Sequence, residues 1–290
     1  MLEEYLLEKK KIVEKELLKK LEKYKYPQEF SEAINYSVMN GGKRLRPILM
    51  YMICDLFLEN ENKIKDIASA LEFIHCYSLV HDDLPAMDND MYRRGKLTTH
   101  IKYGEAVGIL VGDVLLTEAF NIISQSKHIS DKSKVEIIKK LSEYAGFYGM
   151  VGGQFLDVEL ERKKISFDTL KYIHENKTGK LITAAIELPL IALNIEENIK
   201  DKLIKYSKFI GLAFQIKDDI LDVESNFEKM GKKSSDEKLE KNTYPRLLGI
   251  EKSKEILNEN ILKAKEILQN NFKNNELLLE LTEYIGSRGV

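Results

Sequence analysis

The 290-residue sequence is poor in three residue types that mark particular protein classes. It contains no tryptophan, two cysteines and five prolines. Cys54 and Cys76 lie in apolar helical stretches without the spacing of a metal site, so we expect two reduced core thiols rather than a disulfide. The prolines fall mostly near segment ends or in motifs, which leaves long stretches free to form helices.

An excess of charge of either sign is also missing, since 45 basic and 47 acidic residues give a net charge of −2. This balance argues against a nucleic-acid-binding protein that relies on overall positive charge. Residues 1–5 are acidic without an apolar core and do not predict a secretory signal. The longest uncharged apolar runs, such as 48–54, are far shorter than the roughly 20 residues of a membrane helix. We therefore expect a cytoplasmic protein that contacts neither nucleic acid nor membrane.

Helical periodicity is what the sequence does have, and strand alternation is absent. Hydrophobic residues, 43% of the chain, recur at three- and four-residue intervals in six segments: 67–80, 106–123, 135–149, 170–193, 200–223 and 253–268. Segment 182–193 is apolar on most faces, as central helices of a bundle are, whereas 2–25 has the pattern of an outer amphipathic helix. No fixed repeat or low-complexity linker divides the chain. We predict a large all-α bundle that forms one domain over residues 1–290, with a functional polar loop at 224–245.

Two acidic clusters stand at the ends of apolar segments, "LVHDDLPAMDNDMYRRG" at 79–95 and "FQIKDDILD" at 214–222. In the second cluster Asp218 and Asp222 are four residues apart, so both carboxylates project from one helix face. In the first cluster Asp82 and Asp88 would lie about 120° apart on an unbroken helix. Pro85 disfavours helix at the residue before it, so we expect the chain to bulge there and to return Asp88 toward Asp82.

Carboxylates that are clustered in this way need either water or a cation to offset their repulsion. Oxygen ligands alone suit a hard cation, and Mg²⁺ typically binds one or two carboxylates together with substrate phosphates. Solvated helix ends are the simpler interpretation of a single Asp-Asp pair. Two such pairs, with Arg93 and Arg94 just after one of them, favour a metal site. The alternating ligands and central glycine of an EF-hand are missing.

A basic motif, "MNGGKRLRP" at 39–47, places a glycine pair and three cations directly before an apolar helix. Glycine allows close backbone approach, Pro47 fits a first helical turn, and anions bind well at a helix start. The motif alone is a weak signal, because basic loops are usually just solvated. Together with Arg93, Arg94, Lys177 and Lys232 it predicts two positive groups, one for a diphosphate held through metal and one for a diphosphate held directly.

These motifs together resemble the trans-prenyl (isoprenyl) diphosphate synthase family, and most of all its bacterial farnesyl type. The matching segments run in the family's order over most of the chain: GGKRLRP at 41–47, the His75 helix, DDLPAMDNDMYRRG at 82–95, GGQFLD at 152–157, KTGKL at 177–181, GLAFQIKDDILD at 211–222, GKKSSDEKLEKNTYP at 231–245 and Arg288. The resemblance implies the isoprenoid synthase bundle with a central cavity. It also implies a homodimer, and head-to-tail condensation of isopentenyl diphosphate with an allylic diphosphate.

The resemblance further implies a role for each matching residue. The allylic diphosphate would be surrounded by about three Mg²⁺ ions, held by Asp82, Asp83, Asp88, Asp218 and Asp222. The same diphosphate would be bound by Arg93, Lys177 and Lys232. Isopentenyl diphosphate would be bound without metal by Lys43, Arg46, His75 and Arg94, joined by Arg288. Dipoles for the allylic cation would come from Lys177, Thr178 and Gln215. The released pyrophosphate would take the final proton, so no side chain is named as general base.

Two histidines and one lysine leave alternatives open. His75 matches a substrate ligand, but a histidine on an apolar helix is also an ordinary core residue. His81 beside Asp82 is typical of metal phosphohydrolases too, although the further histidines of such sites have no counterpart here. The loop 224–245 would close over the site with Lys232 and Lys241. The family's usual Gly-Lys is replaced by Glu240-Lys241 at the second lysine, which puts a carboxylate near phosphate.

The length of the product is predicted from Tyr77 and its neighbour Ser78. Tyr77 is five residues before Asp82, roughly 7.5 Å further along the helix, where its ring would form the floor of the prenyl tunnel. The farnesyl type of the family carries an aromatic residue there, so we expect a C15 product. A tyrosine that only fills the core is the alternative.

Three other functions are alternatives. The first is geranylgeranyl (C20) diphosphate synthesis. The second is a terpene cyclase, whose mixed Asn, Ser and Glu second metal site differs from "DDILD" and which lacks a second substrate for GGKRLRP. The third is a non-catalytic subunit of a heteromeric synthase, although such subunits commonly lose acidic-motif residues and this chain has lost none.

Overall fold

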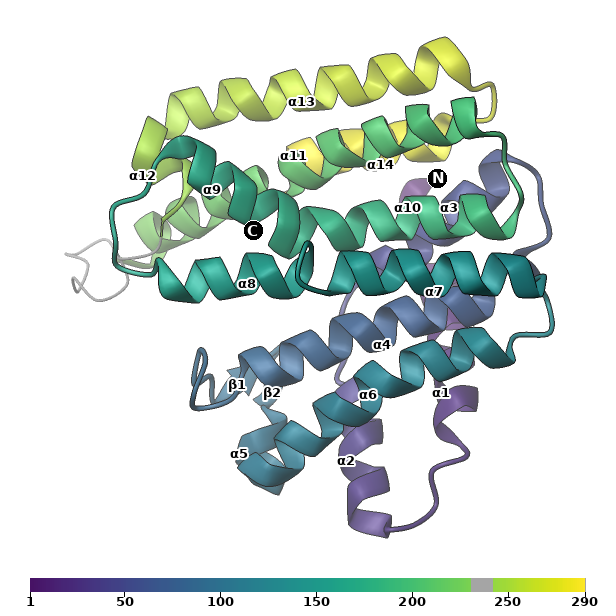
Figure 1. Cartoon of the computed structure of the whole chain (residues 1–290). Helices are drawn as coiled ribbons and strands as arrows, with labels where there is room; N and C mark the ends of the chain where they lie inside the picture. Colours follow the sequence, from purple (N-terminus) through teal and green to yellow (C-terminus); the bar gives the residue numbers. More distant parts are fainter. Residues whose placement is uncertain (231–241, 290) are drawn as a thin grey trace. The chain divides into compact units, whose positions relative to one another are not determined.

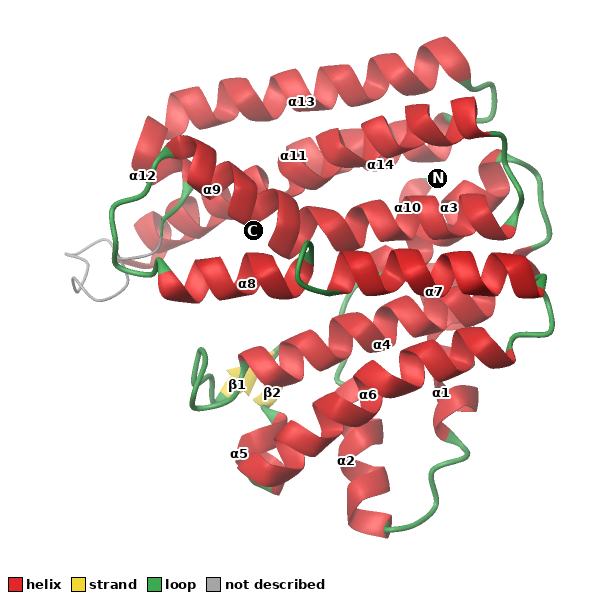
Figure 2. Cartoon of the chain, viewed as in Figure 1, coloured by secondary structure: helices red, strands yellow, loops and turns green. Residues whose placement is uncertain are grey.

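The structure, a computed structural model, describes residues 1–230 and 242–289. Helices account for 76% of the chain, and the described residues contain one pair of two-residue strands (Figure 2). The prediction of an all-α fold is confirmed. The chain divides into two compact units, unit 1 with residues 1–141 and 188–194 and unit 2 with residues 142–187 and 195–290. The single domain over 1–290 stays a prediction.

Unit 1 carries the amino-terminal helices and the first acidic cluster. Its elements are α1 (Leu2–Leu21), α2 (Gln28–Val38), α3 (Leu45–Leu56), η1 (Glu61–Lys63), α4 (Lys65–Asp82), β1 (Tyr92–Arg93), β2 (Lys96–Leu97), α5 (Thr99–Tyr103), α6 (Glu105–Gln125) and most of α7 (Asp131–Ala145). α4 is the central helix, because apolar residues on several of its faces, among them Ile67, Leu71 and Phe73, are fully buried. α6 runs along α4 (Figure 1).

α6 is a long apolar helix without a long uncharged run, so the prediction about uncharged apolar runs is unchanged. Its 21 residues are long and apolar enough to cross a membrane, although Asp113 and Glu118 interrupt the uncharged run in the sequence. One such helix is weak support for a membrane segment, since core helices of soluble proteins have the same composition. In this structure α6 packs along α4 and also contacts α2 and α5, which cover part of its apolar surface.

Unit 2 carries the second acidic cluster. Its elements are the end of α7, α8 (Met150–Glu159), α9 (Phe167–His174), η2 (Glu175–Gly179), most of α10 (Lys180–Ala192), α11 (Glu197–Met230), α12 (Tyr244–Leu248), α13 (Ile250–Asn271) and α14 (Glu276–Ser287). α13 lies along α11 and also contacts α14 (Figure 1). The core between them includes the fully buried Tyr206, whose hydroxyl lies 3.0 Å from the Thr282 hydroxyl.

Two segments of unit 2 differ from the sequence prediction. The expected loop 224–245 is helical at both described ends, because α11 continues to Met230 and α12 begins at Tyr244. Segment 224–230 is rich in glutamate, lysine and methionine, which favour helix even where the apolar pattern has ended. The expected helix 170–193 is divided by η2, a π-helical turn at Glu175–Gly179.

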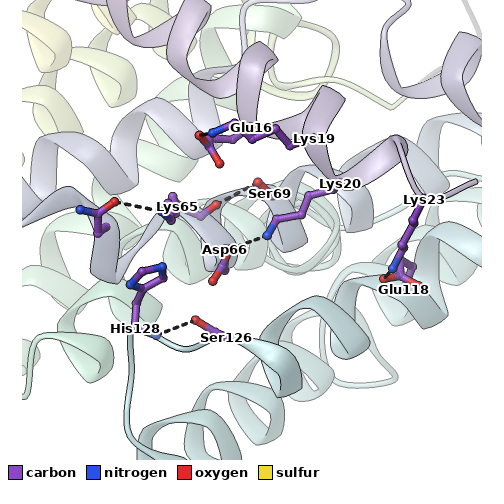
Figure 3. A network of polar contacts seen from close by, with 11 residues as sticks. Glu16, Lys19, Lys20, Lys23, Lys65, Asp66, Ser69, Glu118, Ser126 and His128 are labelled. Carbon is purple, nitrogen blue, oxygen red and sulfur yellow. Dashed lines mark hydrogen bonds and ion pairs between the residues drawn. The ribbon is translucent and has the colours of Figure 1, made fainter.

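A group of charged residues ties α1 to α4 and α6 in unit 1 (Figure 3). Lys20 donates to Asp66 at 2.5 Å, and Lys23 donates to Glu118. Asp66 is 5% exposed. Burial opposes its ionisation, but hydrogen bonds from Lys20 and Ser126 outweigh burial and lower the pKa of Asp66. The ion pair therefore holds the end of α1 on the start of α4.

The Lys20→Met variant is expected to lower the free energy of unfolding by about 1–3 kcal/mol, because Asp66 loses its charged partner while it stays buried. Thermal or urea unfolding measures the change. Lys19→Met is the control, since the Lys19–Glu16 pair at 2.5 Å joins an exposed lysine to its own helix, where a pair contributes about 0.5 kcal/mol or less. Equal stabilities of the two variants would contradict the role of the Lys20–Asp66 pair.

Candidate active site

The first acidic cluster forms a compact turn at the end of α4. The Asp88 amide donates to the Asp82 carbonyl at 2.9 Å, and the Asp90 amide donates to the Asp83 carbonyl at 3.2 Å. The chain therefore returns after Pro85 as the sequence predicts, since proline cannot continue the helix at that point. As a result the backbone of Asp88 lies against that of Asp82, with the Asp88 side chain exposed.

Asp83 is the buried aspartate of this turn, at 4% exposed, and it is paired with Arg93. Arg93 Nε donates to Asp83 Oδ1 at 2.6 Å, and Arg93 Nη2 lies 3.4 Å from Asp90 Oδ2. Burial raises the pKa of Asp83, and Arg93 offsets part of that effect. The structure thus brings together a predicted metal ligand and a predicted diphosphate ligand as an ion pair, so any anion bound here shares Arg93 with Asp83.

A small hairpin, which the sequence pattern did not predict, presents the two arginines. β1 and β2 pair antiparallel, with Tyr92 opposite Leu97 and Arg93 opposite Lys96. The turn consists of Arg94 and Gly95, both with positive φ (55° and 76°), which is the geometry of a tight two-residue hairpin. Strands of two residues are too short to produce an alternating pattern, which explains why the sequence gave no sign of them.

The hairpin turn contacts the glycine pair of the basic motif. Arg94 Nη1 donates to the Gly41 carbonyl, and a Cβ at Gly42 would collide with the Arg94 guanidinium. Gly42 also has φ of 111°, a conformation that side chains other than glycine rarely adopt. Glycine is therefore favoured at 42 by its backbone conformation, and its lack of a side chain leaves room for the Arg94 guanidinium. The contact joins the acidic segment to the loop that carries Lys43 and Arg46.

His75 lies where the predicted ligands of the metal-free diphosphate gather. Arg46 Nη1 and His75 Nε2 are 3.3 Å apart. Burial first, and then the cations Arg46 and Arg94, lower the pKa of His75 well below its usual value. His75 is therefore neutral near pH 7, and the positive charge around it comes from arginine. Lys43 is exposed, and Arg44 between Lys43 and Arg46 is buried.

Tyr77 and Ser78 take different environments on α4. Tyr77 is 5% exposed, and its ring meets the His81 ring edge to face with centroids 5.8 Å apart. The Ser78 hydroxyl donates to the His75 carbonyl at 2.9 Å, so it satisfies its own helix. The tyrosine is thus a fixed apolar wall five residues before Asp82, and Ser78 adds little bulk.

In unit 2, Asp218 and Asp219 of the second cluster have different hydrogen-bond partners. Asp218 Oδ1 accepts a 2.6 Å hydrogen bond from Arg288, whose guanidinium also lies over the Phe214 ring. Asp219 accepts from the Tyr244 amide at 2.9 Å and from Gln215 Nε2 at 3.1 Å, and burial raises its pKa to about 7. Asp222 is exposed one turn beyond Asp218 on α11. Asp218 and Asp222 remain on the accessible side of the helix, whereas Asp219 faces the core.

The π-helical turn η2 places Lys177 and Thr178 beside α8 and α11. Lys177 Nζ donates to Asp157 of α8 at 2.6 Å, and the Thr178 hydroxyl donates to Gln215 Oε1 of α11 at 2.8 Å. A Cβ at Gly153 of α8 would collide with the Lys177 amide, so a glycine lets the two backbones approach. Turns of this type recur at functional sites. The predicted Lys177, Thr178 and Gln215 are thus brought into one group.

Comparison with known proteins identifies the family. The family model described as polyprenyl synthetase matches residues 27–285. The chain belongs to the polyprenyl synthetase family. A farnesyl diphosphate synthase from Micrococcus luteus is 46% identical over 258 residues, 89% of this chain and 88% of that protein. A geranylgeranyl diphosphate synthase from Cyanophora paradoxa is 44% identical over 252 residues, 86% of this chain and 84% of that protein. The crystal structure of a geranyltransferase from Legionella pneumophila superposes with a TM-score of 0.89 at 35% identity, covering 99% of this chain and 97% of that one.

Membership of the polyprenyl synthetase family establishes a prenyltransferase whose substrates are isoprenoid diphosphates and which depends on metal. Within the described residues, no three His, Cys, Asp or Glu side chains form a ready-made metal cage. The residues nevertheless fit a hard cation, because the turn at Pro85 returns the exposed Asp88 to the backbone of Asp82. Mg²⁺ usually keeps several waters and takes its remaining ligands from substrate phosphate, so it does not need a complete protein cage.

Some predicted residues of the family site are not described, and other functional residues were not predicted. Lys232, Glu240 and Lys241 lie outside the described residues. Arg288 is bound to Asp218 in unit 2, and its predicted contact with isopentenyl diphosphate stays a prediction. Sequence reasoning assigned no role to Asp157, the partner of Lys177, although it ends the GGQFLD motif. It also left out Asp219, whose position inside the Asp-Asp pair was the available signal.

Proposed function

We propose that this chain is a farnesyl diphosphate synthase, which condenses isopentenyl diphosphate head-to-tail with dimethylallyl and then geranyl diphosphate. One observation carries the proposal. The same helix, α4, presents an acidic turn for a metal-bound diphosphate at Asp82 and a cluster of cations for a metal-free diphosphate around His75. Two diphosphates bound in two different ways are what a condensation of two such substrates requires. A terpene cyclase has no second diphosphate substrate for the basic motif.

The metal would be Mg²⁺, about three ions for each active site, bound by the two acidic clusters together with the allylic diphosphate. Its proposed ligands are Asp82, Asp83, Asp88, Asp218 and Asp222. When bound, Mg²⁺ neutralises the charge that develops on the leaving diphosphate as its C–O bond breaks. For Asp83 to contribute, it would have to share its oxygens with Arg93, to which it is bound in this structure.

The isopentenyl diphosphate site would consist of Lys43, Arg46, His75 and Arg94. Arginine forks suit phosphate because they donate two parallel hydrogen bonds, and lysine adds a point charge. His75 is neutral near pH 7, so it donates or accepts a single hydrogen bond without adding charge. Binding at this site therefore needs no metal.

The allylic end of the reaction would be controlled by Arg93, Lys177, Thr178 and Gln215, with Lys232 from the part of the chain that is not described. Arg93 and Lys177 bind and orient the diphosphate, and both already contact carboxylates, Arg93 that of Asp83 and Lys177 that of Asp157. Thr178 and Gln215 face the developing cation with polar atoms that are fixed by their mutual hydrogen bond. They stabilise charge without acting as nucleophiles.

A product of C15 is favoured over C20 by Tyr77. Similarity also supports C15, because farnesyl diphosphate synthases of several bacteria are 39–46% identical over most of the chain, whereas the geranylgeranyl synthase is a weaker match. The buried ring of Tyr77, fixed against His81, would end the prenyl tunnel at farnesyl length. We further propose that the protein is a cytoplasmic homodimer, as the family resemblance implies.

The proposed function is tested by incubating the purified protein with labelled isopentenyl diphosphate, each allylic primer and Mg²⁺, and by sizing the dephosphorylated alcohols. Farnesol is the expected main product from dimethylallyl and from geranyl diphosphate. Mainly C20 alcohol would assign the protein to geranylgeranyl synthesis. Absence of any product from the protein alone would favour a non-catalytic subunit.

Chelation of divalent metal is expected to abolish turnover while isopentenyl diphosphate still binds. Turnover depends on the acidic clusters, whereas the cluster of cations around His75 carries its own charge. Calorimetric titration of isopentenyl diphosphate into protein in EDTA measures whether this substrate binds without metal. If EDTA abolished both turnover and the binding of isopentenyl diphosphate, the proposal that one diphosphate binds through metal and the other without it would be wrong.

A further inference from the structure

We propose that Arg44, through its ion pair with Glu72, is a positioning residue that fixes the basic segment of residues 41–46, the loop before α3 and the start of α3, against α4. The inference rests on the proposed isopentenyl diphosphate site and concerns how that site is held together. Arg44 is the middle cation of GGKRLRP, so its sequence position suggests a phosphate ligand like Lys43 and Arg46. In the structure it points into the protein instead.

The contacts of Arg44 connect three helices of unit 1. Its Nη1 donates to Glu72 of α4 at 2.7 Å, and its Nη2 donates to the carbonyl of Val38, the last residue of α2, at 2.7 Å. Its Nε lies 3.7 Å from Glu14 of α1. Arg44 is 3% exposed and Glu72 is 2% exposed. With its guanidinium enclosed by these partners, Arg44 is not available to a substrate phosphate.

The backbone explains why this residue faces inward while its neighbours do not. Arg44 has φ of 52° and ψ of 33°, the left-handed conformation, immediately before α3 begins at Leu45. A non-glycine residue in this region is uncommon and is retained only where the surroundings hold it. The two 2.7 Å hydrogen bonds of the guanidinium supply that hold.

The Arg44–Glu72 pair lies close in sequence to the residues of the proposed isopentenyl diphosphate site, so it can hold them in position. Arg44 adjoins Lys43 and is two residues before Arg46, while Glu72 is three residues before His75 on α4, close to one helical turn. The pair thus links the two segments from which the anion ligands come. A shift at this link would change the separation of Arg46 and His75, now 3.3 Å, and small displacements of binding groups cost large factors in rate.

Stability alone is a weak explanation for the pair. Two charges that are removed from water lose their hydration, and replacing a buried pair with apolar residues of similar size is often neutral or stabilising. Removing one partner is different, because the other charge is left buried and uncompensated. A test must therefore remove both charges together, so that folding and positioning are separated.

The experiment compares wild type, the double variant Arg44→Met/Glu72→Met and the milder Arg44→Lys, with Lys20→Met/Asp66→Met as the matched control. The control removes another ion pair of unit 1 that has a buried carboxylate. Asp66 lies in the first turn of α4, nine residues before His75. The Kd of isopentenyl diphosphate in EDTA, the KM of each substrate and the thermal midpoint are measured for all four proteins.

The double variant is expected to keep a midpoint close to that of wild type and to bind isopentenyl diphosphate about tenfold more weakly or worse. Its KM for the allylic substrate should stay within about twofold, and Arg44→Lys should lie between the two. The control should match wild type in both KM values. Unchanged binding by the double variant, or equal weakening by the control, would overturn the inference. If wild type itself failed to bind isopentenyl diphosphate in EDTA, the proposed metal-free site would be wrong, and the inference that rests on it would be wrong too.

Discussion

Replacing Asp82 with alanine is expected to lower kcat by about 10²–10³-fold or more, and Asp218→Ala should have a similar effect. Asp82 ends α4 and shares a backbone hydrogen bond with Asp88, so its loss removes one oxygen ligand from the centre of the acidic turn. The leaving diphosphate then develops charge with less metal to neutralise it. Steady-state kinetics over a range of Mg²⁺ concentrations measures the loss and the shift in metal dependence.

The control for both variants is Asp201→Ala, an exposed aspartate near the start of α11, the helix that also carries Asp218. It should leave kcat within about twofold, because exposed substitutions away from special features have small effects. Unfolding curves should show that all three variants fold. A near-normal rate of Asp82→Ala at low Mg²⁺ would contradict the metal-binding role.

Replacing Tyr77 with alanine is expected to change the main product from C15 to C20 or longer. Tyr77 is buried on α4, and its ring is fixed edge to face against His81, so its removal opens a space where the prenyl tunnel is proposed to end. The growing chain can then accept a further isopentenyl unit before it is released. Chromatography of the dephosphorylated alcohols measures the distribution of chain lengths.

Tyr77→Phe is the matched control for this experiment, because it keeps the ring and removes only the hydroxyl. It should still give C15. The alanine variant is also expected to lose about 3–5 kcal/mol of stability through the cavity it leaves, so products are compared at a temperature where it stays folded. If the alanine variant still gave C15 alone, Tyr77 would be an ordinary core residue.

Much of the fold and part of the site could be predicted from the sequence, because they depend on local chemistry. The apolar periodicity of α4 and α6 and the helix-breaking effect of Pro85 act within a few residues. The return of Asp88 to Asp82 follows from them. The order of motifs was specific enough to indicate the family, which the match to residues 27–285 confirms.

The features that were missed depend on contacts between segments that are distant in sequence. Arg44 lies among cations in sequence, yet it is buried because Glu72 and the Val38 carbonyl bind it. The hairpin around Arg94 is too short for periodicity, and its turn is stabilised by the Gly41 carbonyl. η2 interrupts a segment that has the sequence pattern of one helix. The backbone of η2 packs closely against Gly153 of α8 at this point.

The central claim is that both acidic clusters bind one diphosphate through shared metal ions. Anomalous diffraction from crystals grown with Mn²⁺ and an unreactive allylic thiolodiphosphate tests this claim directly. The account predicts ions that bridge the diphosphate oxygens to Asp82 or Asp88 on one side and to Asp218 or Asp222 on the other, at about 2.0–2.2 Å from each oxygen. Ions bound to one cluster alone, with the diphosphate out of reach of the other, would contradict it.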